Sequence, residues 1–183
     1  MISRAVAKPP ELLSLARRTL LWHLDGEDLT NPALFPRQSP PQACFVSLKL
    51  EPGDRLRGCI GSLAPTKHTL EEEVVGNAVA AASQDPRFDP VRREELARIR
   101  ISIDLLTPPE FVESEAELDP FRYGLIVRAG DRCGVLLPDL PGVQSVARQI
   151  AICREKAGLS ANEIIRMERF TVERLDEMEP AVL

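Results

Sequence analysis

The chain of 183 residues is poor in aromatic residues and in histidine. Aromatic residues make up only 4% of it, so the hydrophobic core must be built mainly from Leu, Ile, Val and Ala. Neither histidine, His23 or His68, belongs to a motif of recognisable spacing, which argues against a Ser-His-Asp triad or a facial metal triad. We expect both to be structural or exposed. His68 is the stronger functional candidate because only a short loop separates it from Cys59.

Cysteines are few and irregularly spaced. The four are Cys44, Cys59, Cys133 and Cys153, and no C-x-x-C pair occurs among them, so neither a zinc ribbon nor a thioredoxin-like site is indicated. Nucleotide-binding motifs of the Walker and G-x-G-x-x-G types are also missing. We therefore predict no metal and no cofactor. Reduced thiols in the cytoplasm are the simplest interpretation for so few cysteines.

Long apolar runs and an excess of basic residues are missing too. The apolar stretch over 12–24 is interrupted by Arg17 and Arg18, so neither a signal peptide nor a transmembrane span is predicted. The formal net charge of -5 argues against a protein that binds nucleic acid mainly by neutralising phosphates. We expect a cytoplasmic protein that binds neither membranes nor nucleic acid.

The N-terminal part shows clear local patterns. Apolar residues at helical spacing predict a helix over 10–24 that Gly26 terminates. A strand is predicted over 44–50, followed by a turn at 51–54. The next segment is predicted to be a strand or loop that completes a hairpin and presents Cys59. The proline-rich segment between helix and strand is expected to be an extended, partly buried loop.

The rest of the chain alternates in the same way. Thr69 and Glu72 are spaced as a capping box, which predicts the start of a second helix that ends before Asp85. The remaining predictions are a short helix over 89–96, a half-buried strand over 99–105, a hairpin of strands 124–128 and 133–137, a helix over 143–156, a short helix capped by Ser160, and a last strand near 170–172. Hairpins joined by helices indicate an antiparallel α+β fold.

The most informative stretch is Leu56-Arg57-Gly58-Cys59-Ile60-Gly61. Its glycines let a neighbouring segment or a ligand approach the backbone closely. Arg57 can hold an anion and would favour the thiolate of Cys59. Cys59 is thus either a small packing residue at a tight crossing or a reactive thiol. We expect it to be the most readily alkylated of the four cysteines, because Arg57 favours its thiolate and the flanking glycines leave it uncovered.

Asp85-Pro86-Arg87-Phe88 forms a second cluster. In a structural interpretation Asp85 ends a helix and Arg87 pairs with a carboxylate. In a functional one, Arg57, Asn77 and Arg87 converge on a cleft that has Cys59 at its floor and binds a small anion. The candidate groove residues are therefore Arg57, Gly58, Gly61, His68, Asn77, Asp85 and Arg87, with Cys59 as the candidate catalytic residue.

The hexapeptide resembles the signature of the AMMECR domain family. Further matches continue the resemblance over most of the chain: Gly76-Asn77-Ala78, Asp85-Pro86-Arg87-Phe88, Ile101-Ser102-Ile103, Tyr123-Gly124-Leu125-Ile126-Val127, Gly134-Val135-Leu136-Leu137-Pro138 and Lys156-Ala157-Gly158-Leu159. The resemblance implies one domain over 1–183 with two lobes, the larger built from both ends of the chain, and a groove between them. Bacterial members take their name from the AmmeMemoRadiSam system, which also contains a Memo-like protein and a radical S-adenosylmethionine protein.

Two functional classes follow. The first is an accessory or adaptor protein that acts with those two proteins and binds a partner or a peptide through the groove. The second is an enzyme that uses Cys59 as a nucleophile or redox thiol on a small anionic substrate. The sequence leans towards the adaptor because it offers no histidine-based acid–base constellation.

Overall fold

The chain divides into two compact units. Unit 1 comprises residues 1–105 and 173–183, and unit 2 comprises residues 106–172. The structure, a computed structural model, describes residues 9–28 and 39–178. Each unit contains one four-stranded antiparallel sheet, which confirms the predicted α+β class. Most of the proline-rich loop predicted before the first strand lies outside the described residues.

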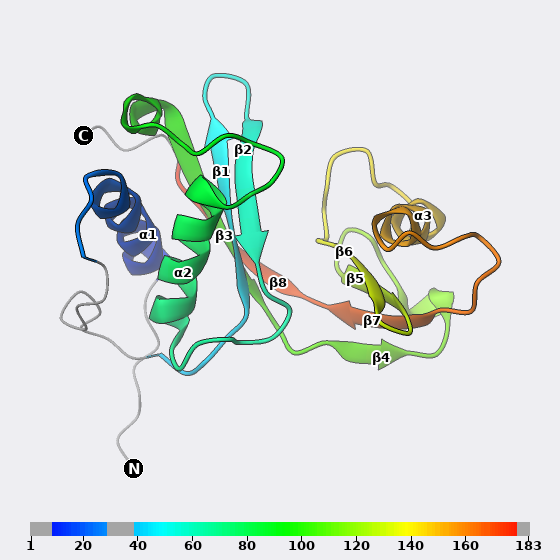
Figure 1. Ribbon diagram of the computed structural model, residues 1–183. Coiled ribbons are helices and arrows are strands. Elements are labelled where there is room, and N and C mark those ends of the chain that lie inside the picture. The colour runs from blue at the N-terminus through cyan, green and yellow to red at the C-terminus, as the bar shows by residue number, and fades with distance from the viewer. Residues whose placement is uncertain (1–8, 29–38, 179–183) are drawn as a thin grey trace, which may run out of the picture. The chain divides into compact units, whose positions relative to one another are not determined.

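Unit 1 is a sheet with two helices on one face. The strand order is β2-β1-β3-β8, from β1 (Cys44–Leu50), β2 (Arg55–Gly61), β3 (Ile99–Leu106) and β8 (Val172–Asp176). The covering helices are α1 (Pro9–Leu24) and α2 (Leu70–Ser83), as Figure 1 shows. Both helices and the first strand confirm the sequence-based predictions, and Gly26 follows α1 with a φ of +77°, as expected for a helix-ending glycine.

Alternation along β1 sets the two faces of this sheet. Cys44, Val46, Leu48 and Leu50 are buried in the core shared with α1 and α2. Because successive side chains of a strand point to opposite faces, Ser47 lies on the face away from the helices. The helices contribute apolar residues at helical spacing: Leu12, Ala16, Leu20, Leu70, Val74, Ala78 and Ala81.

The predicted hairpin of β1 and β2 is confirmed, with a turn at residues 51–54 in which Gly53 has a φ of +108°. In its register Ser47 opposes Cys59 and Leu48 opposes Gly58. An irregularity after Leu48 leaves Arg57 as the extra residue of β2, so the strand bends there. The hairpin thereby fixes Cys59 on the sheet face opposite the helices.

Three local predictions for unit 1 need correction. The side chain of Thr69 accepts from the Glu72 amide at 3.2 Å, but the Glu72 carboxylate accepts from the His68 amide and closes no capping box on Thr69. The short helix predicted over 89–96 is the 3-10 helix η2 (Arg93–Arg98). Strand β3 is buried on both faces rather than half-buried, because its polar residues Ser102 and Asp104 are buried as well.

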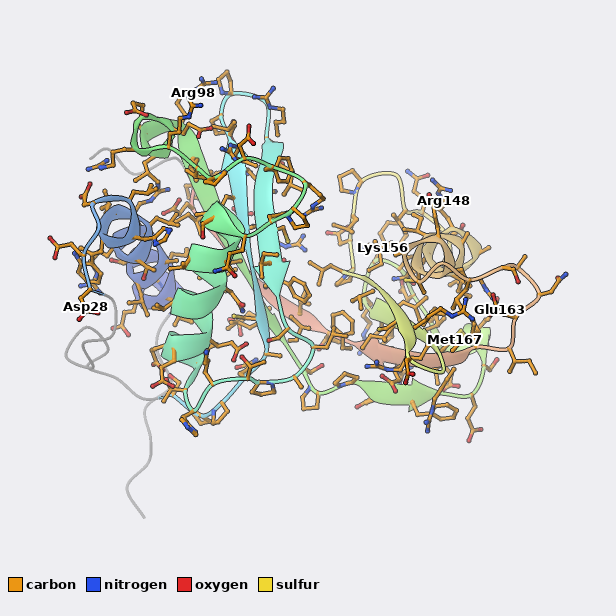
Figure 2. All side chains as sticks on the ribbon, in the orientation of Figure 1. Asp28, Arg98, Arg148, Lys156, Glu163 and Met167 are labelled. Carbon is orange, nitrogen blue, oxygen red and sulfur yellow. The ribbon has the colours of Figure 1, made fainter. Side chains whose placement is uncertain are left out.

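Unit 2 has the strand order β4-β7-β5-β6. Its strands are β4 (Glu110–Val112), β5 (Gly124–Ala129), β6 (Arg132–Leu136) and β7 (Arg166–Phe170). The helix α3 (Val146–Lys156) packs on β5 and β6. Lys156, labelled in Figure 2, donates from Nζ to the Val135 carbonyl at 2.7 Å and ties the end of α3 to β6.

The hairpin of β5 and β6 confirms its prediction, whereas other bounds differ. Helix α3 begins three residues later than predicted because the side chain of Ser145 caps it, accepting from the Arg148 amide at 3.2 Å. Residues 160–163 form a turn and not a helix. The single last strand predicted near 170–172 is two strands, β7 and β8, which Thr171 separates. None of the helices in the described residues has the length and apolarity to cross a membrane.

Candidate functional site

Cys59 lies in β2, an edge strand of the unit 1 sheet. The backbone groups that Cys59 turns away from β1 are bound by two side chains from the loop after α2. Its N–H donates to Asp85 Oδ2 at 2.9 Å, and its carbonyl accepts from Arg87 Nη2 at 3.3 Å. We call these two side chains the Asp85–Arg87 clip. The clip satisfies the edge of the strand at this point.

The two side chains of the clip also bind each other. Arg87 donates to the Asp85 carboxylate from Nη2 at 2.6 Å and from Nε at 2.9 Å. Asp85 is buried, whereas the Arg87 side chain is 54% exposed. The bonds from Arg87 and from the Cys59 amide outweigh burial and hold the pKa of Asp85 well below its ordinary 3.8. Asp85 is therefore ionised at neutral pH.

The thiol of Cys59 lies beside a serine. Ser47 Oγ and Cys59 Sγ are 3.2 Å apart, and Cys59 is half-buried. Burial raises the pKa of the Cys59 thiol above its ordinary 9.0, although the Ser47 hydroxyl and the Arg87 charge oppose the rise. Asp104 and Asp85 add to it. The neutral thiol therefore predominates at physiological pH, and a neutral thiol is a poor nucleophile.

Arg57 has other partners, which corrects the expectation that it supplies the cation beside the thiol. Its guanidinium forms a bidentate pair with Glu95, at 2.8 and 3.0 Å. It also donates to the carbonyls of Asp89 and Pro90, at 2.8 and 3.2 Å. The ion pair lowers the pKa of Glu95, and the bonds to the two carbonyls hold the loop before η2 against β2. The cation that acts on Cys59 is Arg87.

The glycines of the signature serve close packing on both faces of β2. A Cβ at Gly58 would lie 2.1 Å from the carbonyl oxygen of Ala81 in α2. A Cβ at Gly61 would lie 2.3 Å from the ring of Phe45. Neither contact is sterically allowed, so both positions exclude any larger residue without a shift of the neighbouring segment.

Neither Asn77 nor His68 forms a hydrogen bond with Cys59 or with the clip. Asn77 Nδ2 donates to the carbonyl of Cys44 at 3.0 Å and lies 3.4 Å from its sulfur, so it ties α2 to the start of β1. His68 is exposed. The structure thus brings Asp85 and Arg87 to Cys59 and places the other polar candidates elsewhere.

Sequence reasoning missed a buried carboxylate next to the signature. Glu73 in α2 accepts from Ser62 Oγ at 2.5 Å and from the amides of Thr66 and Lys67 at 2.7 and 2.9 Å. These bonds hold its pKa below the ordinary 4.5 despite burial. Glu73 therefore organises the loop that follows β2. It is one of three consecutive glutamates, 71–73, and no local pattern distinguishes it from Glu72.

Sequence reasoning also missed a row of buried polar residues across the sheet. Ser102 opposes Ser47 in the neighbouring strand, and Asp104 pairs with Arg174 at 2.6 Å. With Cys59 they line the face away from the helices. Over the described residues, no group of three or more His, Cys, Asp or Glu side chains is arranged to hold a metal ion.

This geometry defines a class of antiparallel α+β proteins with two units. In the first unit, the Asp85–Arg87 clip binds an edge strand of sequence Arg-Leu-Arg-Gly-Cys-Ile-Gly. A family model described as AMMECR1 matches residues 13–175. The chain belongs to the AMMECR1 family.

Relatives from bacteria and archaea share this domain. A Thermotoga maritima protein is 48% identical over 82% of this chain and 85% of its own length. The crystal structure of the uncharacterized protein PH0010 from Pyrococcus horikoshii aligns with a TM-score of 0.83 and 32% identity, covering 93% of this chain and 91% of that one. A Clostridium acetobutylicum protein is 40% identical over 90% of this chain, but this chain spans only 36% of that protein.

Proposed function

We propose that this protein is an accessory or adaptor protein that acts together with a Memo-like protein and a radical S-adenosylmethionine protein. The contact runs through a groove that contains the Arg57–Gly61 segment. The observation that carries the proposal is the state of Cys59. Its thiol is half-buried with a raised pKa, and its backbone is bound by the Asp85–Arg87 clip. This arrangement supports a rigid recognition strand better than a nucleophile.

The clip also restricts how a partner binds. An open edge strand invites strand addition by another chain, but at Cys59 the outward N–H and C=O are already taken. Recognition therefore uses side chains along this edge. Leu56 in β2 is a large apolar residue that is 37% exposed, and the Arg87 side chain is 54% exposed. Arginine is enriched at protein interfaces, and an exposed Leu56 adds apolar area that a partner can bury.

The Clostridium relative supports a role in which this domain works in association with other protein domains. The region similar to this chain occupies 36% of that relative, so most of that polypeptide is additional sequence. Fusion of this kind keeps a domain close to the rest of its polypeptide at high effective concentration. We infer that this chain also acts in close association with other proteins.

Co-purification tests the adaptor directly. Tagged chain is co-expressed with the Memo-like and the radical proteins from the same genome, and the retained amount of each is quantified. We expect wild type and Cys59→Ser to retain a partner, and Leu56→Ser and Arg87→Gln to retain less. Ile164→Ser is the matched control, because Ile164 is an apolar residue of unit 2 that is 95% exposed. If wild type retains neither protein, the proposal fails.

The second candidate function is an enzyme that uses Cys59 on a small anionic substrate. Two contacts favour it: the Ser47 hydroxyl at 3.2 Å and the charge of Arg87, both of which lower the pKa of the thiol. Metabolite profiles of strains that carry wild type or Cys59→Ser separate the two functions. An enzyme loses its product in Cys59→Ser although partners are still retained, whereas the adaptor keeps a wild-type profile.

A further inference from the structure

Unit 2 contains a small polar pocket that the proposed function does not use. Its volume is about 230 Å³, below the range of about 300–1,000 Å³ that is usual for drug-sized ligands, so it suits a smaller molecule. Residues lining it include two arginines, two threonines, one tyrosine and one glutamate: Arg122, Arg169, Thr107, Thr171, Tyr123 and Glu110. A pocket with two cations and one acid favours a negatively charged ligand.

Arg169, in β7, has an unused hydrogen-bonding edge. Its Nη1 donates to the carbonyl of Glu117 at 2.7 Å, and its guanidinium lies over the ring of Tyr123, 4.5 Å from the centroid. Its Nε is buried, and none of the described residues accepts a hydrogen bond from it. Nη2 is 3.6 Å from the Glu110 carboxylate, which is beyond hydrogen-bonding distance. The Nε–Nη2 edge is one with which arginine holds an oxyanion bidentately.

The neighbours of Arg169 strengthen the preference of the pocket for a negatively charged ligand. The guanidinium of Arg122 also lies over the Tyr123 ring, 5.1 Å from the centroid, so two cations share one aromatic residue. The Glu110 side chain is 71% exposed, which leaves its carboxylate free to turn into solvent. An entering anion can therefore replace Glu110 as the partner of Arg169 without burying an unpaired carboxylate.

The threonines fix one wall of the pocket. The Thr107 amide donates to the Thr171 carbonyl at 3.0 Å, and the Thr171 amide donates to Thr107 Oγ1 at 3.0 Å. Their hydroxyl oxygens are 3.3 Å apart. A wall held by these hydrogen bonds keeps its shape before a ligand arrives, which lowers the entropy lost on binding.

We propose that this pocket binds a small oxyanion, a carboxylate or a phosphate, on the Nε–Nη2 edge of Arg169. Arg122 is the second cation of the site, and Glu110 is the group that the ligand displaces. The proposal concerns unit 2 alone and does not depend on the adaptor function. It stands or falls separately from the co-purification result.

Amide NMR titration of the full-length chain tests the site, with succinate and inorganic phosphate as probes at constant ionic strength. We expect saturable shifts at the amides of Thr107, Arg169 and Thr171, with a dissociation constant on the order of 1 mM for a site of this size. Saturation by succinate alone identifies a carboxylate site, and saturation by phosphate alone a phosphate site. If neither probe saturates, or if the shifts map outside the pocket, the proposal is overturned.

Three variants sharpen the test. Arg169→Gln should weaken binding about tenfold or more, since it removes a charged hydrogen-bonding edge. Glu110→Gln should tighten binding, because it removes the competing carboxylate, and damage to the fold cannot produce a gain. Arg166→Gln is the matched control: Arg166 is in the same strand, on the opposite face, over the ring of Phe111. No gain in Glu110→Gln, or equal losses in Arg166→Gln and Arg169→Gln, would overturn the site.

Discussion

The carboxylate of Asp85 accepts the backbone N–H of Cys59 at 2.9 Å, although 26 residues separate the two along the chain. The same carboxylate pairs with Arg87, which binds the carbonyl of Cys59. A single buried acid thus joins the loop after α2 to the edge strand β2. Asp85 accepts a hydrogen bond from the outward-facing N–H of the signature strand, and this bond is in turn one of those that keep Asp85 ionised.

Removal of Asp85 should therefore cost stability. Asp85→Ala leaves the Cys59 amide without an acceptor and Arg87 without its partner, and we expect the free energy of unfolding to fall by about 3 kcal/mol. Asp85→Asn keeps one acceptor and should lose about half as much. Urea denaturation followed by circular dichroism measures both. Asp89 is an exposed aspartate of the same loop, and the free energy of unfolding of Asp89→Ala should stay within about 0.5 kcal/mol of wild type.

The contact between Asp85 and Cys59 also predicts how the stability of the protein changes at low pH. The pKa of Asp85 is lower in the folded protein than its ordinary 3.8, so the folded state favours the ionised form. This contribution is complete above pH 3.8 and is lost as the pH falls towards the folded-state pKa. We expect the wild type to lose stability below pH 3.8 more steeply than Asp85→Asn. Parallel acid titrations of the two proteins would contradict the assignment.

Gly58 and Gly76 should respond in opposite ways to the same added methyl group. In Gly58→Ala the Cβ meets the Ala81 carbonyl of α2 at 2.1 Å, so we expect a loss of about 2 kcal/mol or more. In Gly76→Ala the nearest atom is the flexible Lys67 Cε at 3.6 Å, and a helical Ala should add about 0.5–1 kcal/mol. Denaturation midpoints of the pair decide the matter. Equal effects would refute the packing role of Gly58.

Local signals in the sequence predicted much of the fold. The alternation of Cys44, Val46, Leu48 and Leu50 marks β1, and Gly53 marks the turn after it, because both depend on neighbours within a few residues. The two hairpins and the α+β class follow from such patterns. The same reasoning could not find the burial of Ser102 and Asp104, since their pattern is that of a strand with one exposed face.

The candidate site was less predictable because its contacts are long-range. The hexapeptide drew attention to β2, but proximity in sequence suggested Arg57 as the cation beside Cys59, and the fold supplies Arg87 instead. Arg57 is the extra residue at the irregularity of β2 and pairs with Glu95, 38 residues away. Neither the irregularity nor that pair has a local signature.

Neutralising Glu73 should lower the free energy of unfolding more than neutralising its neighbour Glu72. Glu73→Gln replaces one acceptor oxygen by a donor that faces the amides of the loop after β2, and we expect a loss of about 2 kcal/mol. Hydrogen exchange at the Thr66 and Lys67 amides should accelerate. Glu72→Gln is the matched control, since the Glu72 carboxylate accepts from the amide of the exposed residue His68. Unchanged exchange in Glu73→Gln would mean that the loop is held by other contacts.

The last prediction concerns the reactivity of Cys59. Burial raises the pKa of its thiol above the ordinary 9.0, so its alkylation rate at pH 7 should be lower than that of a free thiol and should still be rising above pH 9.0. Cys44 and Cys153 are buried, with pKa values raised to about 12, and should react after Cys59. Mass-spectrometric mapping of a limiting iodoacetamide label across a pH series measures the order and the rates.

Two arginine variants identify the cation that acts on this thiol. Arg87→Gln removes a positive charge that lowers the Cys59 pKa, so alkylation should slow several-fold and its pH profile should move upwards. Arg57→Gln changes an arginine that pairs with Glu95 and should leave the profile where it is. Alkylation that slows in Arg57→Gln and not in Arg87→Gln would restore Arg57 as the controlling cation. Label on Cys59 only after denaturation would make it a packing residue and would remove the enzyme from consideration.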